Sequence, residues 1–279
     1  MFGNNINIRS VDRLIRCVLM VLLSLFISGC SKSDVPTDKN ELIDYMSEAD
    51  VTEYSVELNT EIDVLTEIVD STTSDEIIFR DNSIYTVIAD KAVVEKDIFK
   101  SSFFNGETTD NESSYFDFKN SVEYQKNNDT DKQYIEIVNY DLVNLSDFLK
   151  DIETSNSDIF KQLKFNDDDK DFYILEGTLE SSSAKQLWRN LVVDGMCSWD
   201  VFFNENTADV PVSIYVDKDT YLIDSVDFDL EDMLNAYFEN HQYYDNTHVY
   251  EIRSNDCKIQ FVYDDLATNS IEIPDIVNQ

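Results

Sequence analysis

The feature that most constrains the fold of this chain is a long alternation of apolar and polar side chains. In residues 54–64 every second position is apolar or threonine, and the positions between them carry Ser, Glu, Asn and Asp. Successive side chains of a β-strand point to opposite faces of its sheet, so this spacing predicts a long strand with one buried and one polar face. The same period returns in residues 210–216, 226–230 and 257–263. Strands of this kind favour an antiparallel sheet with one face packed on the core.

Shorter segments complete the predicted secondary structure. Further strands are predicted for residues 77–79, 84–89, 115–118, 122–125, 134–140 and 172–179, with a hairpin turn at 127–131. Apolar residues at helical spacing predict helices in 41–49, 145–152, 184–192 and 231–239, and residues 159–163 either extend the helix of 145–152 or form a second one. Ser183 is expected to cap the helix of 184–192, and residues 105–114, which are polar, are expected to form a loop. The predicted class is α+β, with about eight to eleven strands.

The first thirty residues predict where the chain is sent. Arg9, Arg13 and Arg16 precede an apolar run of about a dozen residues, which is the length of a signal-peptide core and too short for a membrane span. The run ends in Ile-Ser-Gly-Cys at positions 27–30, which resembles the lipobox of bacterial lipoproteins. We therefore predict a signal peptide at 1–29, a lipidated tether at 30–40 and a single domain at 41–279. The alternative is an ordinary signal peptide followed by an unrelated cysteine.

The lipobox resemblance implies a membrane anchor. In bacterial lipoproteins the cysteine of this box, here Cys30, carries acyl chains such as palmitate and becomes the first residue of the mature protein. Each methylene buried in the bilayer contributes about 0.8 kcal/mol to the attachment. We expect a monomer at the outer face of the cytoplasmic membrane, or at the periplasm-facing side of the outer membrane if the host is Gram-negative.

The chain is strongly acidic, and this excludes some partners. It has 57 acidic and 21 basic residues, a net charge of −36, and loss of the predicted signal peptide leaves about −38. Such a surface repels nucleic acid and anionic lipid head groups. We therefore expect no nucleic-acid binding, and we expect the acyl chains on Cys30 to make the contact with the bilayer.

Two cysteines remain after the signal peptide and the lipobox are set aside. They are Cys197 and Cys257. Outside the cytoplasm such a pair is a candidate disulfide, which would stabilise the fold by about 4 kcal/mol because it closes a long loop of the unfolded chain. The alternative is that each cysteine is a small buried hydrophobic residue.

Motifs that carry chemistry are weak in this chain. His241, Asp245 and His248 have a spacing at which two imidazoles and a carboxylate could hold a zinc-like ion, but the residues between them favour a solvated turn. Residues 166–171 resemble the start of a calcium loop, but they lack the glycine and the final glutamate of an EF-hand, which favours an acidic loop. Nucleophile-elbow, phosphate-loop and Cys-x-x-Cys motifs are absent from the sequence. We expect a protein without a cofactor that is not an enzyme.

The C-terminal third resembles a known family. Residues 212–228, with the turn Tyr-Val-Asp-Lys-Asp-Thr-Tyr-Leu at 215–222, and the closing segments 259–265 and 271–274 are similar to LolA/LppX-like lipoproteins of low-GC Gram-positive bacteria. The resemblance implies a curved antiparallel sheet, a half-barrel, with helices on its concave side. It also implies an apolar cavity for lipid or acyl chains, and no catalytic residues.

Two functions follow from these observations. In the first, a lipid or another apolar ligand is held between sheet and helices, and the candidate lining residues are Phe148, Leu149, Ile152, Leu187, Trp188 and Leu191. In the second, these residues form an ordinary core, and an acidic surface binds a partner at the cell surface. An exposed apolar patch away from the sheet interior would favour the second function.

Overall fold

The computed structural model describes residues 35–49, 51–68, 74–88, 91–102, 106–117, 119, 122–127, 132–137, 145–152, 157–191, 208–240 and 248–263. By their contacts, residues 1–37 and 38–279 form two separate units, and every element described below belongs to the second. Cys30, Cys197, His241 and Asp245 lie outside the described residues. The predictions that rest on these four residues therefore stay predictions.

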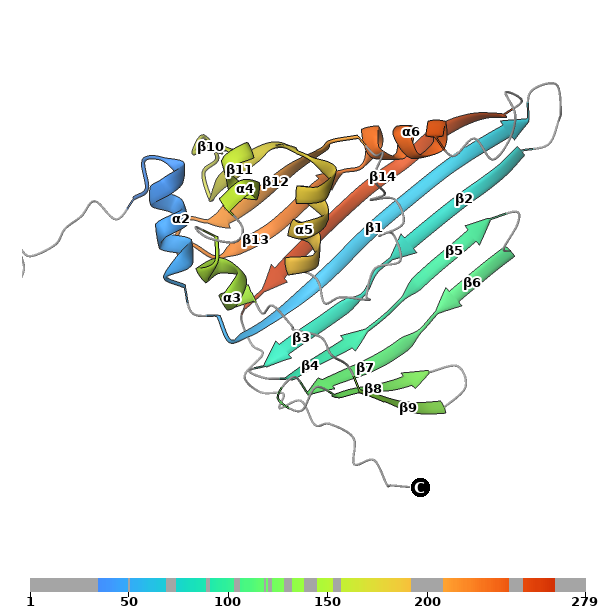
Figure 1. Ribbon diagram of the computed structural model, residues 1–279, viewed down its shortest axis with the longest axis horizontal. Helices are drawn as coiled ribbons and strands as arrows, with labels where there is room; N and C mark the ends of the chain where they lie inside the picture. Colours follow the sequence, from blue (N-terminus) through green and yellow to red (C-terminus); the bar gives the residue numbers. More distant parts are fainter. Residues whose placement is uncertain are drawn as a thin grey trace, which may run out of the picture. The chain divides into compact units, whose positions relative to one another are not determined.

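The larger unit contains an antiparallel sheet of 14 described strands, centred on two long ones (Figure 1). Strand β1 (Glu53–Ile68) pairs from Ser55 to Ile68 with the full length of β14 (His248–Val262), with an irregularity between Asp63 and Val64. Beyond β14 the order continues through β13 (Ile223–Asp229), β12 (Val210–Asp217), β11 (Phe172–Leu179) and β10 (Lys164–Asn166). The alternation of residues 54–64 and 210–216 therefore predicted these strands correctly.

On its other side β1 joins two branches of the sheet. Its residues 53–57 pair with β3 (Ile84–Ile88), which is followed by β4 (Lys91–Glu95), β7 (Glu112–Asp117), β8 (Val122–Asn127) and β9 (Lys132–Ile137). Its residues 60–67 pair with β2 (Ser74–Asp81), which is followed by β5 (Ile98–Ser102) and β6 (Gly106–Asp110). The chain passes from one branch to the other with little between them. Only two residues separate β2 from β3, and only two separate β4 from β5.

These interruptions explain two differences from the sequence-based expectation. The described strands number 14 rather than eight to eleven, because short breaks divide longer strands. Backbone hydrogen bonds continue across these breaks: Leu58 N donates to Ser83 O (2.8 Å), and Asn82 N donates to Asp97 O (3.0 Å). The expected loop at 105–114 is instead strand β6 and the start of β7. Residues 106–109 are exposed, so β6 carries the polar composition of a loop although its backbone pairs with β5.

Five helices are described: α2 (Lys39–Ser47), α3 (Leu145–Lys150), α4 (Ser157–Gln162), α5 (Ser181–Leu191) and α6 (Glu231–Asn240). Helix α2 begins before residue 41 because the Asp38 carboxylate accepts hydrogen bonds from the first-turn N–H groups. Helix α5 also begins earlier than expected. Ala184 N already donates to Glu180 O, and Ser183 lies inside the helix, where its hydroxyl accepts from Gln162 Nε2 instead of capping.

The helices lie on one face of the sheet, mainly over one end of it. Their main contacts with strands are between α4 and β11, between α5 and both β11 and β12, and between α6 and β14 (Figure 1). We call the face that carries Val56 and Leu58 of β1, which contacts the helices, the inner face, and the opposite one the outer face. The predicted class, an α+β fold with an antiparallel sheet and helices on one face of it, is confirmed.

Candidate functional site

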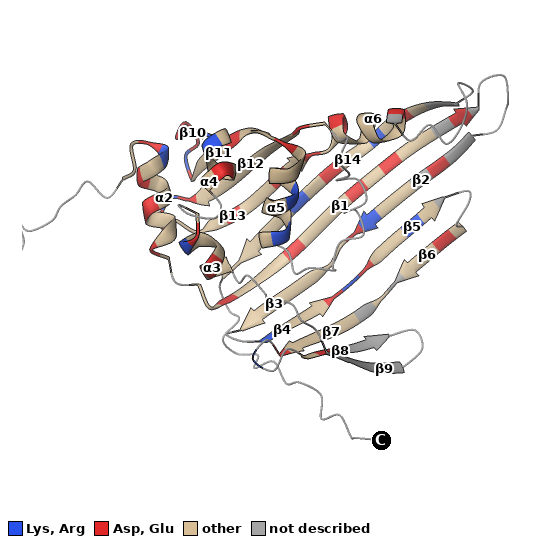
Figure 2. Ribbon diagram, in the orientation of Figure 1, with Lys and Arg blue, Asp and Glu red and all other residues tan. Residues whose placement is uncertain are grey.

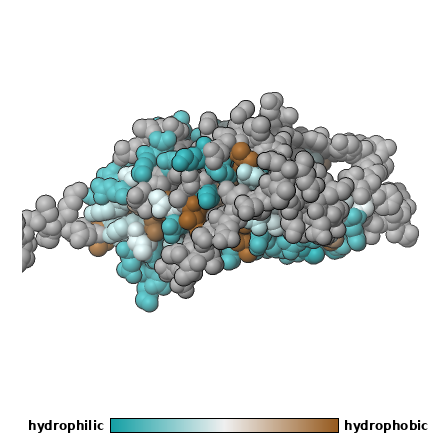
Figure 3. Space-filling view, turned by 90° about the horizontal axis from the view of Figure 1, so that it is seen from below, coloured by the Kyte–Doolittle hydropathy of each residue, from teal (hydrophilic) through white to brown (hydrophobic). Residues whose placement is uncertain are grey.

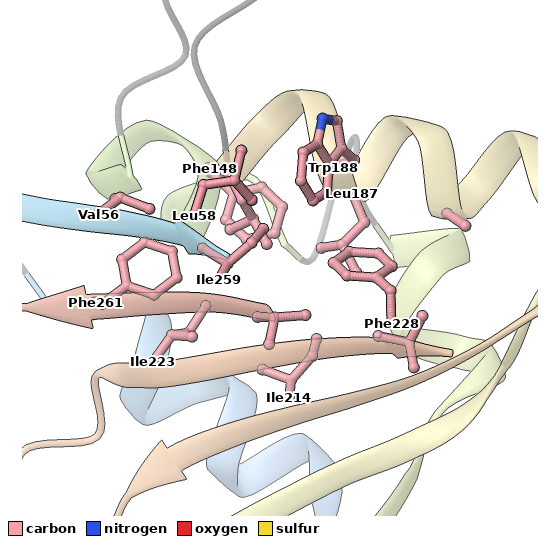
Figure 4. Close-up of a cluster of buried hydrophobic side chains, with 14 of the residues drawn as sticks. Val56, Leu58, Phe148, Leu187, Trp188, Ile214, Ile223, Phe228, Ile259 and Phe261 are labelled. Carbon is pink, nitrogen blue, oxygen red and sulfur yellow. The ribbon is translucent and has the colours of Figure 1, made fainter. Parts of the chain in front are cut away.

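The six residues expected to line a ligand cavity are packed in the core beneath the helices. Their exposed fractions are 0–3%. Figure 4 shows Phe148, Leu187 and Trp188 pointing from the helices towards Val56, Leu58, Ile214, Phe228 and Ile259 of the strands. A side chain without accessible surface borders no space large enough for a water molecule. Beneath the helices, these residues therefore form an ordinary core. This was the alternative to a ligand cavity that the sequence left open.

Aromatic contacts strengthen this packing. The ring of Trp188 meets that of Phe228 edge-on, with centroids 5.5 Å apart and an interplanar angle of 71°. Phe148 and Phe160, from α3 and α4, lie 6.0 Å apart. Such pairs contribute about 0.5–1.5 kcal/mol each beyond the burial of their surface. A ligand entering here would have to break these contacts.

The inner face continues beyond the helical layer across β3, β4, β7 and β8. Two cross-strand rows occupy it. The first is Val56, Tyr85, Val94 and Ser114, and the second is Tyr54, Val87, Ala92, Phe116 and Glu123. All nine residues are at most 5% exposed. We call them the inner β3–β8 face. The described helices make their main contacts elsewhere. Its side chains are nevertheless as buried as those beneath the helices, so this largely apolar face becomes a candidate binding surface only when what covers it moves aside.

One polar atom on the inner β3–β8 face has no partner. The hydroxyl of Ser114 is fully buried, and no hydrogen bond to it is formed. Leaving a buried hydroxyl unsatisfied costs about 1–3 kcal/mol. Glu123, a buried carboxyl on the same face, lies opposite Phe116 and therefore diagonal to Ser114. The two side chains place a polar spot in an apolar wall.

Two tyrosine hydroxyls mark the border between this face and the helical layer. Leu145 N, at the start of α3, donates to Tyr54 Oη (3.2 Å), and Tyr85 Oη donates to Leu191 O at the end of α5. Burial raises the pKa of Tyr54 to about 12 and the pKa of Tyr85 well above its ordinary value. Both hydroxyls are therefore protonated near neutral pH and hold the helices in place.

Cys257 is buried and carries a free thiol in the structure. Its sulfur lies 3.5 Å from Thr60 Oγ1, and burial raises its pKa. A thiol of this kind is inert, because reactivity depends on the thiolate. Cys197, its predicted partner, is outside the described residues, so the disulfide stays a prediction.

The acidic loop at residues 166–171 binds a lysine. Lys218 Nζ donates to Asp167 O (3.1 Å) and Asp169 O (2.5 Å), and it lies 5.0 Å from the ring centroid of Tyr173. An ammonium group thus binds two backbone carbonyl oxygens of this loop. Within the described ranges, no three His, Cys, Asp or Glu side chains are arranged to hold a metal ion. His248 is the first residue of β14, and the other two residues of the candidate zinc motif are outside those ranges.

The outer face of the sheet is acidic. Asp229, Asp256 and Glu61 lie directly opposite one another on β13, β14 and β1, an arrangement that repulsion destabilises. Arg80 continues the row on β2, with its Nε 3.2 Å from Glu61 Oε1. Figure 2 shows acidic residues along β1 and β14. In Figure 3, which views the molecule from below, teal covers more of the coloured surface than brown.

Two of the most exposed large apolar residues also lie on the outer face. Ile84 is 40% and Val262 is 37% exposed. Ile84 of β3 pairs with Glu57, and Val262 of β14 pairs with Ser55. Glu57 and Ser55 are two positions apart on β1, so Ile84 and Val262 lie on the same face of the sheet, one on each side of β1. The outer face therefore combines carboxylates with an apolar spot.

The class of protein is thus an α+β protein with an open antiparallel sheet and a helical layer on part of one face. In the part of the chain that is described, no helix is long and apolar enough to cross a membrane. No protein-family model and no curated protein sequence matches the chain.

Solved structures that are similar to the chain include a LolA superfamily protein from Nitrosomonas europaea, with 9% identity, 81% of this chain and 92% of that chain covered, and a TM-score of 0.23. A DUF1329 family protein from Desulfovibrio piger has 12% identity, the same coverage and a TM-score of 0.24. A putative outer membrane lipoprotein-sorting protein domain from Vibrio parahaemolyticus has 9% identity, 81% and 89% coverage and a TM-score of 0.21. At these values the likeness assigns neither a family nor a function.

Proposed function

We propose that this chain is a non-enzymatic binding protein of the cell envelope, anchored through acyl chains on Cys30, that holds an apolar ligand on the inner β3–β8 face after this buried face has opened. The observation that carries the proposal is the pair of buried rows that continue beyond the helical layer, from Val56 to Ser114 and from Tyr54 to Glu123. A wall of this composition suits acyl chains, because it is apolar over most of its area.

The proposed ligand position differs from the one that the sequence suggested. The side chains of Leu187, Trp188 and their neighbours pack against strand side chains, which leaves no room for a ligand beneath the helices. The inner β3–β8 face is instead bordered by the helices, through the hydroxyls of Tyr54 and Tyr85.

The test is to fill the proposed space and ask whether ligand is lost. Ala92→Phe places a ring on the inner β3–β8 face, whereas Val93→Phe places the same ring on the outer face of the same strand. Native mass spectrometry and lipid extraction are applied to the mature chain purified from a bacterial host without detergent. We expect a bound amphiphile with the wild type and with Val93→Phe, and none with Ala92→Phe. Absence of ligand from all three contradicts the proposal.

The anchor has its own test. A Cys30→Ala variant cannot be lipidated, so we expect it in the culture medium of a Gram-positive host, whereas the wild type stays with the membrane. A variant that is processed at the signal peptide and still sediments with the membrane would contradict the anchoring.

A second candidate function is partner binding through the outer face. It is favoured by the row Asp229, Asp256 and Glu61 together with exposed Ile84, since a cationic amphipathic partner would complement both. We expect a lysine–leucine peptide to bind in a salt-dependent manner and to bind more weakly to Glu61→Gln and Ile84→Ser. Glu180→Gln, before helix α5, is the control. Equal binding by all variants contradicts an outer-face site.

A further inference from the structure

Strand β6 forms an edge of the sheet that has no second partner strand among the described residues. It pairs with β5 along residues 106–110, and no strand of the described ranges pairs with its other side (Figure 1). We propose that this edge binds an extended basic segment of a partner protein, which joins the sheet as one more strand. The site is independent of the apolar ligand that the proposed function places on the inner β3–β8 face.

The edge at β6 is a step in the sheet. Strands β6 and β7 are separated by Asn111 alone, so they are two parts of one length of chain. The β7 part is followed by β8 and β9, whereas the described sheet stops at the β6 part. Asn127, the last residue of β8, pairs with Glu112, the first residue of β7, so the unpaired edge starts where β8 ends. An added strand of about five residues, the length of β6, would therefore lie in line with β8.

The free side of β6 is open to solvent. Residues 106–109 are all exposed. The backbone N–H and C=O groups on the free side of an edge strand are a template for pairing with another strand. At the β10 end of the sheet, by contrast, the edge strand has only three residues. Strand β6 therefore offers a longer edge that a partner can reach.

The sequence of β6 decides which strands it admits. Natural edge strands are often protected by proline, by a charged side chain or by a bulge. Strand β6, Gly-Glu-Thr-Thr-Asp, contains no proline, and its two threonines favour strand pairing. Glu107 is exposed, and its negative charge repels an acidic strand but attracts a basic one. The edge is therefore selective for basic segments.

The register of an antiparallel pair predicts the sequence of the partner. Residues directly opposite each other interact, and both opposite charges and pairs of threonines are favourable there. We expect lysine or arginine opposite Glu107, and threonine or another β-branched residue opposite Thr108 and Thr109. Lys100 of β5 pairs with Thr108 on the other side of β6. The added strand would lie two strand spacings, about 9–10 Å, from β5, where salt screens most of that positive charge.

A second copy of the chain fits this edge less well. Each copy carries a net charge of −36 and an exposed Glu107 on the strand that would pair. Like charges across an antiparallel pair are destabilising, and two strongly acidic chains repel each other. A basic partner removes both penalties.

The experiment compares two labelled peptides that differ in one residue. The basic probe contains Val-Thr-Thr-Lys-Val and the acidic probe Val-Thr-Thr-Glu-Val, each flanked by serines and capped at both ends. When the probe lies antiparallel to β6, its fourth residue is opposite Glu107 and its threonines are opposite Thr108 and Thr109. Fluorescence anisotropy is measured with the chain that carries Cys30→Ala in about 0.15 M salt, where charges more than about 8 Å apart are largely screened.

We expect the basic probe to bind about three- to fivefold more tightly than the acidic one, and Glu107→Lys to reverse this preference. Glu107 is exposed, so its replacement should not disturb the fold. Glu95→Lys is the matched control. It makes the same change of charge at an exposed position of β4, which has a paired strand on each side, and it should keep the preference of the wild type.

Hydrogen exchange tests the strand addition itself. With saturating basic probe we expect amide exchange in residues 106–110 to slow about tenfold, because their free N–H groups gain acceptors. Equal binding of the two probes, an unchanged preference in Glu107→Lys, or no added protection of residues 106–110 overturns the proposal. A dimer of the chain without peptide that protects the same residues overturns it as well, because the occupant of the edge is then a second copy.

Discussion

Tyr85 Oη donates a hydrogen bond to the backbone oxygen of Leu191, although the two residues are 106 positions apart. Tyr85 belongs to β3, and Leu191 is the last residue of α5. The last carbonyls of a helix have no partner within it, so this bond satisfies one of them from the sheet. The helical layer is thus fixed at the edge of the proposed ligand face.

Removing that hydroxyl should destabilise the fold. Tyr85→Phe leaves the buried carbonyl of Leu191 without its partner, and we expect a loss of about 1–3 kcal/mol in the free energy of unfolding. Urea denaturation followed by circular dichroism measures it. Tyr115→Phe removes a half-buried hydroxyl from the outer face and should cost less than about 0.5 kcal/mol. Equal effects would mean that the bond to Leu191 does not contribute.

Alkaline pH should also destabilise the fold. The pKa of Tyr54 is raised to about 12 from 10.0, mainly because burial penalises the phenolate. Below pH 10 both the folded and the unfolded states keep this proton, so the stabilisation is fully present. Between pH 10 and 12 the unfolded state releases the proton first, and the free energy of unfolding falls by about 2–3 kcal/mol for this group.

The measurement is chemical denaturation at several values of pH from 9 to 12. Tyr54→Phe should flatten the decline, although it lowers stability at pH 9 because Leu145 N loses its acceptor. A decline as steep in Tyr54→Phe as in the wild type would assign the effect to other groups. Tyr85, whose pKa is also raised by burial, is the first of these.

Lys39 should stabilise the contact between α2 and α4. Its ammonium donates to Phe160 O (2.9 Å) and Leu163 O (2.8 Å), which lie at the end of α4. A cation at a helix C-terminus also interacts favourably with the helix dipole. We expect Lys39→Met to lower the free energy of unfolding by about 1–3 kcal/mol. Lys161→Met, which removes an exposed ion pair with Asp158, should cost less than about 0.5 kcal/mol and is the control.

The strands with one buried face could be predicted from sequence, because their alternation is a local signal. Strands β1, β12 and β13 were recognised in this way. The pairing of β4 with β7 was not, because it joins residues 91–95 to 113–117, and nothing local records which strands meet. The helix of 181–191 was recognised by its apolar stripe, but three consecutive serines gave no basis for choosing its first residue.

The candidate site was missed for a related reason. Ser114 lies in the segment expected to be a loop, although extending the alternation back from Phe116 would have placed it on the buried face. Leu187 and Trp188 were given a binding role because their helix is amphipathic, a pattern that core packing produces equally well. Whether an apolar face meets side chains or a ligand depends on tertiary contacts that periodicity does not contain.

Tyr221 has a backbone conformation that is rare for an aromatic residue. Its φ is 58°, in the left-handed region, at the end of the turn in which Asp217 Oδ1 accepts from Asp219 N and Thr220 N. Such a conformation costs a residue with a Cβ about 1–2 kcal/mol relative to glycine. Its ring stacks on Tyr45 of α2, with centroids 4.7 Å apart, and on Tyr173, at 6.3 Å. The two stacks offset the cost of the backbone.

A double-mutant cycle tests this balance. Tyr221→Gly removes the backbone cost and both stacks, so we expect its effect on the free energy of unfolding to be within about 1 kcal/mol of zero. In a Tyr45→Ala background one stack is already lost, and the same substitution should then be more favourable by about 0.5–1.5 kcal/mol. Urea denaturation of the four proteins measures the coupling. If Tyr221→Gly has the same effect in both backgrounds, the stack with Tyr45 does not offset the strain, and the compensation must come from Tyr173 alone.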